Sequence, residues 1–286
     1  MERHFFKFQN LSLSYLEAGQ THSKKVLIAH ANGYAAGMYA YLIDALKTRY
    51  HVCALDFSGH GESQSTLEFN SWDFFRDQIF ALMNHKEWHT CVGVGHSLGG
   101  GSLIRAAIQD SSRFEKIIAF DPVVLSHLAI FYIYLFGNSM ARAALARRAV
   151  FKSKEQAYKI FDRHPANKSW QRESVRAYID YCIRETANGA ELNCSPAVES
   201  RIFSLKECAH LSKLKNITAE IHLILPPQSH VCPPRAGRHI TSGNLYSTVE
   251  RVANSGHLLP FENHAFVVST VNSFLVSKST VTPSLF

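Results

Sequence analysis

A serine between two glycines, set between an apolar run and a helix-forming stretch, is the feature that most constrains the fold of this chain. Residues 91–94 are apolar, Gly95-His96-Ser97-Leu98-Gly99 follows, and residues 100–109 favour a helix. This order predicts a strand, a sharp turn and a helix, with Ser97 at the tip of the turn. Glycine suits positions 95 and 99 because a side chain there would collide with the neighbouring strand or helix. An anion forming beside Ser97 would meet free N–H groups at the helix N-terminus.

Short apolar runs alternate with helical patterns along most of the chain. The expected strands are 4–9, 11–17, 25–29, 50–55, 91–94, 116–120, 219–225 and 246–253. The expected helices of the same region are 38–48, 72–85, 100–109 and 264–276. Strands that alternate with helices predict a mostly parallel sheet with helices on both faces. We expect the last ten residues to form a loose tail.

Residues 122–216 interrupt this alternation. From residue 124 to about 214 the pattern is helical throughout, and it falls between two expected sheet strands. We therefore expect an inserted lid of residues 122–216 on a core formed by residues 1–121 and 217–286. The segment also holds fifteen Lys and Arg against eight Asp and Glu, so the net charge of +7 belongs to it. Such an excess is either a solvated face or an attraction for an anionic substrate or an acidic membrane surface.

Composition limits the cellular setting and the cofactors. The six cysteines are scattered without a Cys-x-x-Cys pair, which predicts reduced thiols and a cytoplasmic protein. The chain starts with a strand pattern rather than a signal peptide, and no apolar run is long enough to insert stably in a membrane. No zinc spacing, phosphate-binding glycine loop or nucleic-acid motif is present, so we expect no metal, no cofactor and no nucleic-acid partner. The sequence specifies no oligomeric state.

Ser97 needs a neighbouring base because a serine hydroxyl is a poor nucleophile until its proton is taken. Of the sixteen histidines, His257 is the best placed, since it follows a glycine after the strand expected at 246–253. A loop histidine there reaches across the carboxyl ends of the strands towards Ser97. Three further histidines lie inside loop motifs, where we expect them to hold the loops by hydrogen bonds: His30, His60 and His96.

Four segments together resemble the α/β-hydrolase superfamily over nearly the full chain. In order they are residues 30–34, residues 56–63, the turn at 95–100 and the histidine loop at 256–262. The resemblance implies an α/β-hydrolase fold, with an eight-stranded, mostly parallel sheet and an α-helical cap inserted after the sixth strand. It also implies a catalytic triad in the chain order serine, acid, histidine, with Ser97 as nucleophile and His257 as base.

The same resemblance implies an oxyanion hole with two backbone donors. One is the N–H of Leu98, the residue after the nucleophile. The other comes from the loop 30–34, where a gapless match to the usual His-Gly-x pattern places it on Asn32. Ala31 stands where glycine is usual, so Ala31 and Tyr34 stay open as alternative donors. Loss of one such donor typically costs about 3 kcal/mol of transition-state stabilisation.

The acid that should orient His257 is absent from its usual place. The family usually has an aspartate in the loop after the seventh strand, but residues 226–234 contain no carboxylate. Asp121 ends the sixth strand, a position from which some family members take their acid, so Asp121 is the candidate. A carboxylate there fixes the histidine tautomer and stabilises the imidazolium. Three alternatives stay open: Asp56, whose motif usually holds a loop; Glu262, expected to cap the last helix; and a dyad without an acid.

Aromatic residues are candidates for the wall of a substrate pocket. We assign Tyr34 of the loop 30–34 and two residues of the inserted segment, Phe131 and Tyr134, to such a pocket. The helical spacing of the latter two fits packing against the sheet equally well. Four cations fall on roughly one helix face, where they either meet an anionic substrate or stay solvated: Arg142, Arg147, Arg148 and Lys152.

These features predict a serine hydrolase that cleaves a small-to-medium carboxylic ester or thioester through an acyl-enzyme on Ser97. Asp121 would orient His257, and the amides of Leu98 and Asn32 would hold the oxyanion. Hydrolysis of an amide or a carbon–carbon bond is chemically adjacent, and the basic lid slightly favours an acidic substrate such as an acyl-CoA. The alternative from another class is a non-catalytic binding protein that kept the fold, which the missing acid motivates.

Overall fold

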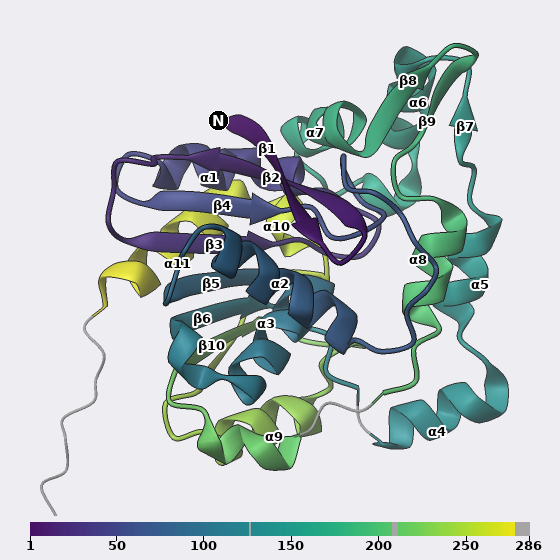
Figure 1. The fold of residues 1–286 in the computed structure, drawn as a ribbon. Helices are drawn as coiled ribbons and strands as arrows, with labels where there is room; N and C mark the ends of the chain where they lie inside the picture. Colours follow the sequence, from purple (N-terminus) through teal and green to yellow (C-terminus); the bar gives the residue numbers. More distant parts are fainter. Residues whose placement is uncertain (126, 208–210, 278–286) are drawn as a thin grey trace, which may run out of the picture.

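The computed structural model describes residues 1–125, 127–207 and 211–277. An eight-stranded sheet forms its centre, with the strand order β1-β2-β4-β3-β5-β6-β10-β11 (Figure 1). β2 pairs antiparallel with β1 and with β4, and the other neighbours are parallel. The mostly parallel eight-stranded sheet is therefore confirmed. Its strands are β1 (Glu2–Phe8), β2 (Leu11–Ala18), β3 (Lys25–Ala29), β4 (His51–Leu55), β5 (Cys91–His96), β6 (Phe114–Phe120), β10 (Glu220–Leu225) and β11 (Thr248–Arg251).

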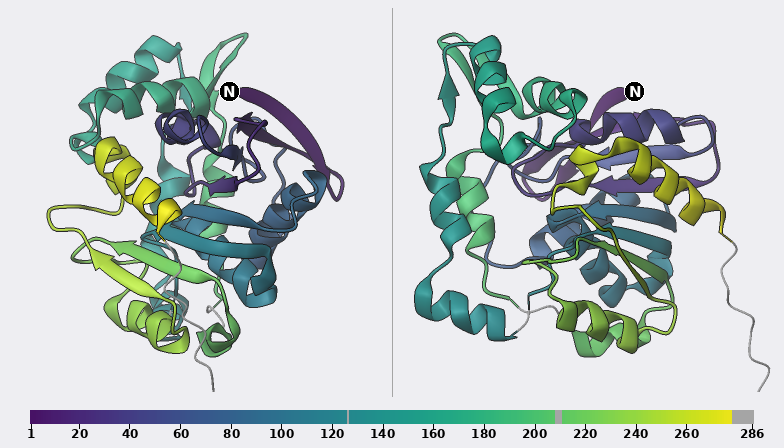
Figure 2. Two further views of the ribbon diagram at one scale, coloured as in Figure 1. Left: turned by 90° about the vertical axis from the view of Figure 1, so that its left-hand side faces the viewer. Right: turned by 180° about the vertical axis from the view of Figure 1, so that it is seen from behind.

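Helices cover both faces of the sheet, as predicted (Figure 2). Neighbouring strand residues therefore enter different cores: Leu27 packs in one core and Ile28 in the other. Because both faces are buried, the central strands are apolar at nearly every position. One core includes α2 (Asp73–His85), α3 (Leu98–Gln109) and α9 (Pro234–Gly243), and the other includes α1 (Ala40–Leu46), α10 (Leu259–Glu262) and α11 (His264–Val276).

Residues 122–216 leave the sheet after β6 and return to it at β10. In Figure 1 the segment lies beyond the ends towards which the parallel strands point. Residues that follow the carboxyl ends of these strands therefore face it. Its helices are α4 (His127–Phe136), α5 (Ser139–Ala146), α6 (Lys154–Arg163), α7 (Arg172–Cys182) and α8 (Pro196–Phe203).

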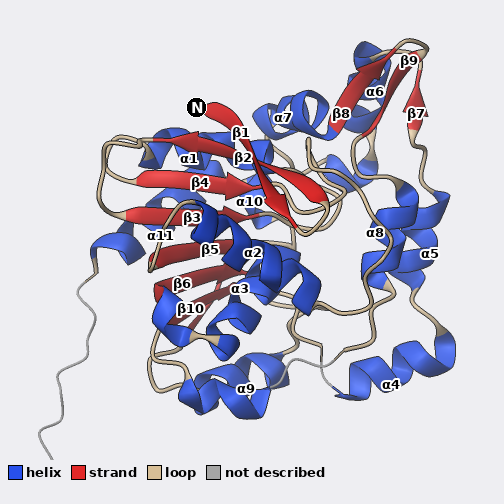
Figure 3. Ribbon diagram, viewed as in Figure 1, coloured by secondary structure: helices blue, strands red, loops and turns tan. Residues whose placement is uncertain are grey.

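The prediction that this segment is helical throughout is wrong, because it also contains a small antiparallel sheet (Figure 3). The sheet has the order β7-β9-β8 and consists of β7 (Val150–Phe151), β8 (Ile183–Thr186) and β9 (Gly189–Leu192). The two residues Ala187 and Asn188 connect β8 to β9, and Gly189 follows them as the first residue of β9. Gly189 has a φ of 135°, and a Cβ there would lie 2.3 Å from the carbonyl oxygen of Phe151. The strands are too short for their alternation to stand out in the sequence.

Five cysteines are buried free thiols, namely those at positions 53, 91, 182, 194 and 232. Cys208 and nearly all of the expected tail lie outside the described residues. Among the helices that the structure describes, none is long and apolar enough to cross a membrane.

Candidate active site

Ser97 lies at the turn between β5 and α3, with a backbone φ of 51° and ψ of −111°. This conformation costs a residue with a side chain roughly 1–3 kcal/mol, so the surrounding packing must impose it. The flanking glycines permit the close approach that the turn requires. A Cβ on Gly99 would lie 2.1 Å from the carbonyl oxygen of Ala29, and a Cβ on Gly95 would lie 2.6 Å from Gly100 Cα.

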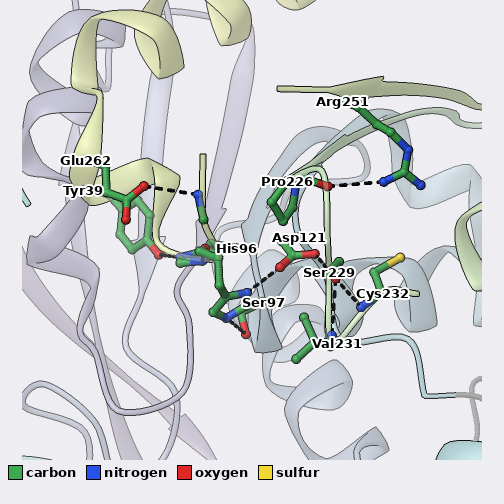
Figure 4. Close-up of polar contacts among 12 residues, drawn as sticks. Tyr39, His96, Ser97, Asp121, Pro226, Ser229, Val231, Cys232, Arg251 and Glu262 are labelled. Atoms are coloured by element: carbon green, nitrogen blue, oxygen red, sulfur yellow. Dashed lines mark hydrogen bonds and ion pairs between the residues drawn. The ribbon is translucent and has the colours of Figure 1, made fainter. Parts of the chain in front are cut away.

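Ser97, His257 and Asp121 form a continuous hydrogen-bonded chain (Figure 4). His257 Nε2 lies 3.0 Å from Ser97 Oγ, and His257 Nδ1 lies 2.6 Å from Asp121 Oδ2. Because a carboxylate accepts the Nδ1 proton, Nε2 keeps a lone pair directed at the serine hydroxyl. The Asp121 side chain is 4% exposed and that of His257 is 33% exposed, so the carboxylate is buried behind the imidazole.

The register of the sheet brings the serine and this acid together. His96 on β5 and Phe120 on β6 are register partners, and Ser97 and Asp121 are the residues that follow them. The Ser97 N–H donates to the Phe120 carbonyl at 3.0 Å, and the Asp121 N–H donates to the Ile224 carbonyl on β10 at 2.8 Å. Asp121 also has a positive φ, of 40°. Both residues therefore turn out of adjacent strands in a left-handed conformation.

The loop after β10 brings a hydroxyl to the site where the resemblance predicts a carboxylate. Ser229 is buried, and its Oγ donates to Asp121 Oδ1 at 2.5 Å. The N–H groups of Val231 and Cys232 donate to the same Oγ at 3.3 Å and 2.7 Å (Figure 4). We did not predict Ser229 from the sequence. The available signal was that it is the only hydroxyl residue between positions 226 and 234.

Asp56, the first alternative acid, is engaged away from His257. Its carboxylate accepts hydrogen bonds from Ser14 Oγ at 2.6 Å and from the Ala36 N–H at 2.7 Å. Arg3 forms an ion pair with it at 2.5 Å. These contacts give Asp56 a structural role at the end of β4.

Glu262, the second alternative, holds the histidine loop rather than capping the last helix. It accepts from Ser169 Oγ at 2.8 Å and lies 3.4 Å from the Gly256 nitrogen (Figure 4). The side chain that caps α11 is that of Asn263, which accepts the Phe266 N–H. Among the described contacts, neither Glu262 nor Asp56 has a hydrogen bond to His257.

The backbone N–H groups of the loop 30–34 differ in their partners. The Gly33 N–H donates to His60 Nε2 at 3.0 Å, and the Tyr34 N–H donates to the Ala31 carbonyl at 3.2 Å. Tyr34 is therefore unsuited as an alternative oxyanion donor. Among the described residues, the N–H groups of Asn32 and Leu98 have no acceptor, whereas that of Ala31 donates to the Tyr39 hydroxyl.

Two buried histidines hold the loops beside the site. His30 Nδ1 donates to the Ala31 carbonyl at 2.7 Å, and its Nε2 accepts the Phe57 N–H at 2.9 Å. Burial lowers the pKa of His30 to about 4. Burial, with the neighbouring His30, lowers the pKa of His60 to about 3. Both side chains are therefore neutral at physiological pH.

His96 holds the backbone of the histidine loop. Its Nδ1 accepts from the Tyr39 hydroxyl at 2.8 Å, and its Nε2 donates to the His257 carbonyl at 2.8 Å (Figure 4). Burial and the adjacent His257 lower the pKa of His96 well below its usual range. A neutral His96 with its proton on Nε2 therefore ties the loop of His257 to the end of β5.

The three aromatic residues assigned to the pocket lie in different environments. Tyr34 packs against the rings of Phe261 at 4.8 Å and Trp170 at 5.9 Å, between ring centroids, and burial raises its pKa. Phe131 and Tyr134, on α4, are 58% and 71% exposed. The Tyr134 ring contacts the Lys206 ammonium at 5.0 Å. Tyr34 is therefore packed among aromatic rings, Phe131 and Tyr134 are exposed, and a lining role for the three stays a prediction.

Arg147 does not share a helix face with Arg142, contrary to the prediction, because α5 ends at residue 146. Its guanidinium turns inward to Glu199 Oε2 at 2.6 Å and to the Tyr178 hydroxyl at 2.7 Å. Arg148 and Lys152 are exposed. Of these cations, Arg147 is thus part of a fixed contact within the 122–216 segment.

That contact lies against the loop 30–34. The Asn32 side chain donates to the Glu199 carbonyl at 3.1 Å. A Cβ on Gly33 would lie 2.8 Å from Glu199 Oε1. The inserted segment is therefore packed directly on the loop that carries Asn32.

Glu17, His51 and Cys53 form a group of described residues close enough to hold a metal, with ligand atoms within 4.8 Å of one another. His51 begins β4, whereas Ser97 follows the end of the parallel strand β5, so the group lies at the opposite edge of the sheet. Glu17 Oε1 already pairs with Lys86 at 2.6 Å and with His51 at 2.5 Å. The lysine ammonium thus supplies the positive charge that this buried carboxylate needs.

A model of the alpha/beta hydrolase family matches residues 26–270. The chain belongs to this family. This α/β-hydrolase is 19% identical over 281 residues to the uncharacterized hydrolase YugF of Bacillus subtilis (strain 168), a match that covers 91% of this chain and 93% of that protein.

Two solved structures share the fold of this α/β-hydrolase. E-2-(acetamidomethylene)succinate hydrolase superposes with a TM-score of 0.79 at 15% identity, over 96% of this chain and 100% of that one. The thioesterase domain from the curacin biosynthetic pathway superposes with a TM-score of 0.77 at 17% identity, over 96% and 99%. The predicted fold is confirmed, and so is the prediction of an enzyme of the α/β-hydrolase family.

Proposed function

We propose that this α/β-hydrolase cleaves a small-to-medium carboxylic ester or thioester through an acyl-enzyme on Ser97. The chain of hydrogen bonds from Ser97 through His257 to Asp121 carries the proposal. It couples a hydroxyl to a base whose tautomer is fixed by a buried carboxylate, which is the arrangement that activates a serine nucleophile. No structural demand of the fold requires a serine beside a histidine at this turn.

In the first step Ser97 Oγ attacks the substrate carbonyl while its proton passes to His257 Nε2. Asp121 stabilises the imidazolium through Nδ1. Collapse of the tetrahedral intermediate breaks the bond to the leaving alkoxide or thiolate, which takes the proton from His257. In the second step His257 takes a proton from water and the hydroxide adds to the acyl carbonyl. Collapse of this second tetrahedral intermediate breaks the bond to Ser97 Oγ, which takes the proton back from His257, and the carboxylic acid is released.

The amides of Leu98 and Asn32 are the proposed oxyanion donors. Both lack an acceptor among the described residues, and Leu98 begins α3, whose positive dipole end faces the developing charge. Ala31 stays the alternative to Asn32, but its N–H would first have to leave the Tyr39 hydroxyl. The side chain of Asn32 is fixed by Glu199, which keeps the loop in one conformation.

Residues 122–216 act as the cap in this proposal, on the core of residues 1–121 and 217–286. Ser97 is only 6% exposed, so a substrate has to enter beneath this segment. A lining role for Phe131 and Tyr134 stays a prediction. Fifteen basic against eight acidic residues in the cap suit an acidic substrate, and the thioesterase domain that shares the fold suits a thioester.

Covalent labelling with a fluorophosphonate tests the proposal, because an activated serine displaces fluoride from the probe and becomes phosphonylated, whereas an ordinary serine hydroxyl reacts far more slowly. We expect rapid labelling of the parent enzyme and none of Ser97→Ala. Parent labelling no faster than that of Ser97→Ala would reject the serine mechanism and favour a binding protein. A panel of esters, thioesters and amides of increasing acyl length then identifies the bond that is cleaved. Turnover of amides alone would contradict the ester and thioester assignment.

A further inference from the structure

The Asp121 carboxylate has a second neutral donor besides His257. Its Oδ2 accepts from His257 Nδ1 at 2.6 Å, and its Oδ1 accepts from Ser229 Oγ at 2.5 Å. Each carboxylate oxygen is thus held by a different segment of the chain. The two bonds together fix the rotation of the carboxylate plane, whereas the bond to His257 alone would leave it free to turn.

The surroundings of Ser229 decide where its single proton points. The N–H groups of Cys232 and Val231 donate to its oxygen, and a hydroxyl oxygen that accepts two donors has its own proton left for an acceptor. Asp121 Oδ1 is that acceptor. The Ser229 hydroxyl is therefore oriented in advance by its own loop.

The loop that carries Ser229 is fixed at both ends. Arg251 Nη1 donates to the Pro226 carbonyl at 3.2 Å (Figure 4). It also donates to the Pro227 carbonyl at 3.4 Å. Further along the loop, the Val231 carbonyl accepts the Val124 N–H at 2.9 Å. A hydroxyl held by so many backbone contacts positions its partner with little loss of conformational entropy.

We infer that Ser229 is a positioning residue that holds the Asp121 carboxylate in the orientation from which it fixes the tautomer of His257. The inference rests on the proposed function, since it assigns Ser229 a role in the serine mechanism. The loop after β10 supplies a donor to the acid in place of supplying the acid itself. Asp121 is almost fully buried, so loss of this donor leaves one carboxylate oxygen without a described partner.

The test compares Ser229→Ala and Ser229→Thr with the parent by two measurements. The first is the second-order rate constant of fluorophosphonate labelling of Ser97. The second is the far-downfield proton NMR signal of the hydrogen bond between His257 and Asp121, which a purely structural role would not move. We expect Ser229→Ala to label about tenfold more slowly, as for loss of one hydrogen bond to a charged group. We also expect its NMR signal to shift, and Ser229→Thr, which keeps the hydroxyl, to retain both properties.

Ser14→Ala is the matched control. Ser14 Oγ donates to a different buried carboxylate, that of Asp56, at 2.6 Å. We expect this variant to lose stability while its labelling rate stays within about twofold and its NMR signal is unchanged, since a hydrogen bond outside the triad affects folding alone. If Ser14→Ala slowed the labelling of Ser97 as much as Ser229→Ala does, the inference would be overturned.

Labelling of Ser229→Ala at the parent rate, with an unchanged NMR signal, would also overturn the inference on Ser229. In that case, labelling of the parent that depends on Ser97 would still support the proposed function. Failure of the parent to label would instead reject the proposed function, and the inference with it. If Ser229→Ala does not fold, Ser229→Cys decides, because a thiol is a weaker donor of similar shape. Labelling of Ser229→Cys that is slower than that of the parent supports the inference, and labelling at the parent rate contradicts it.

Discussion

At the scale of single residues, two side chains leave adjacent strands in left-handed backbone conformations. Ser97 has a φ of 51° and Asp121 a φ of 40°. Such conformations persist only where the surrounding structure imposes them, and they concentrate at functional sites. Here the hydrogen bonds from the two N–H groups to the neighbouring strands β6 and β10 hold them. The proposed nucleophile and acid are therefore placed by the sheet, whereas the base is placed by a loop.

Replacement of Asp121 by asparagine tests the acid. The substituted side chain is an amide that no longer fixes the proton of His257 on Nδ1, so Nε2 is not held as the acceptor for the Ser97 proton. We expect Asp121→Asn to lower kcat by about three to four orders of magnitude, as when the tautomer-fixing carboxylate of a triad is removed. Steady-state kinetics on the substrate found in the panel gives the value.

Glu262→Gln is the control for this prediction. Glu262 also lies beside the histidine loop, but it contacts the Gly256 nitrogen at 3.4 Å rather than the imidazole. A change of no more than a few-fold is expected, since the amide keeps an acceptor for that weak contact. If Glu262→Gln lost as much activity as Asp121→Asn, the assignment of the acid to residue 121 would be wrong.

Some residues of the proposed site could be predicted from the sequence, and one could not. Ser97 and His257 were predicted because a motif and a chain position define them, and Asp121 because it ends a strand at the right edge. Ser229 was not predicted, because its contact with Asp121 depends on the path of a loop between two proline pairs. No pattern of period two or 3.6 describes such a path.

At the scale of helices and strands, the loop 30–34 and α8 form one packed unit. Glu199 of α8 contacts this loop through its carbonyl and its carboxylate, and Arg147 neutralises that carboxylate at 2.6 Å. The prediction of a shared cationic helix face failed for Arg147 because a helix end, rather than the helix period, sets its direction. The β8–β9 hairpin was missed for a related reason, since only its turn carried a clear signal.

Loss of the Arg147 guanidinium should weaken this unit. Arg147→Met keeps the apolar stem but leaves the mostly buried Glu199 carboxylate unpaired beside Gly33. We expect the free energy of unfolding to fall by about 2 kcal/mol, below the roughly 3–5 kcal/mol typical of fully buried pairs, because the arginine is partly exposed. Urea unfolding measures this change, and Arg148→Met, at an exposed neighbour, should have almost no effect. Equal stabilities of the two variants would contradict the prediction.

At the scale of the whole molecule, the stability of the enzyme depends on histidines that stay neutral inside it. Burial lowers the pKa of His30 to about 4 and that of His60 to about 3, from an ordinary value of 6.5. Unfolding exposes both side chains and restores their ordinary pKa. Below about pH 6.5 the unfolded chain therefore binds protons that the folded chain does not, and the folded state loses stability as the pH falls.

The free energy of unfolding should accordingly decrease between about pH 6.5 and 5, by about 1.4 kcal/mol per pH unit for each such histidine. Urea unfolding at several pH values in this window measures the slope. The window ends above 4.5, the ordinary pKa of Glu17, whose pKa is lowered in the folded state by Lys86 and His51 despite its burial. A free energy that stays constant or rises on acidification would show that these histidines are not kept neutral by the fold.

The family match fits the sequence-based prediction of the fold, because the alternation of strands and helices extends over almost the whole chain. The net charge of the chain, by contrast, did not predict a feature of the proposed site. The net charge of +7 arises in residues 122–216, yet Arg147, the cation of that segment seen against the loop 30–34, is neutralised by Glu199.

The inserted segment begins at Pro122, one residue after Asp121. The next two residues are bonded to other parts of the site: Val123 N–H to the Ser97 carbonyl at 3.0 Å, and Val124 N–H to the Val231 carbonyl at 2.9 Å. A chimera that exchanges this segment with that of a relative would disturb the proposed acid, Asp121, if the junction were placed directly before Pro122. The graft should instead start after Val124, so that the recipient keeps the backbone contacts of Val123 and Val124 that position Asp121.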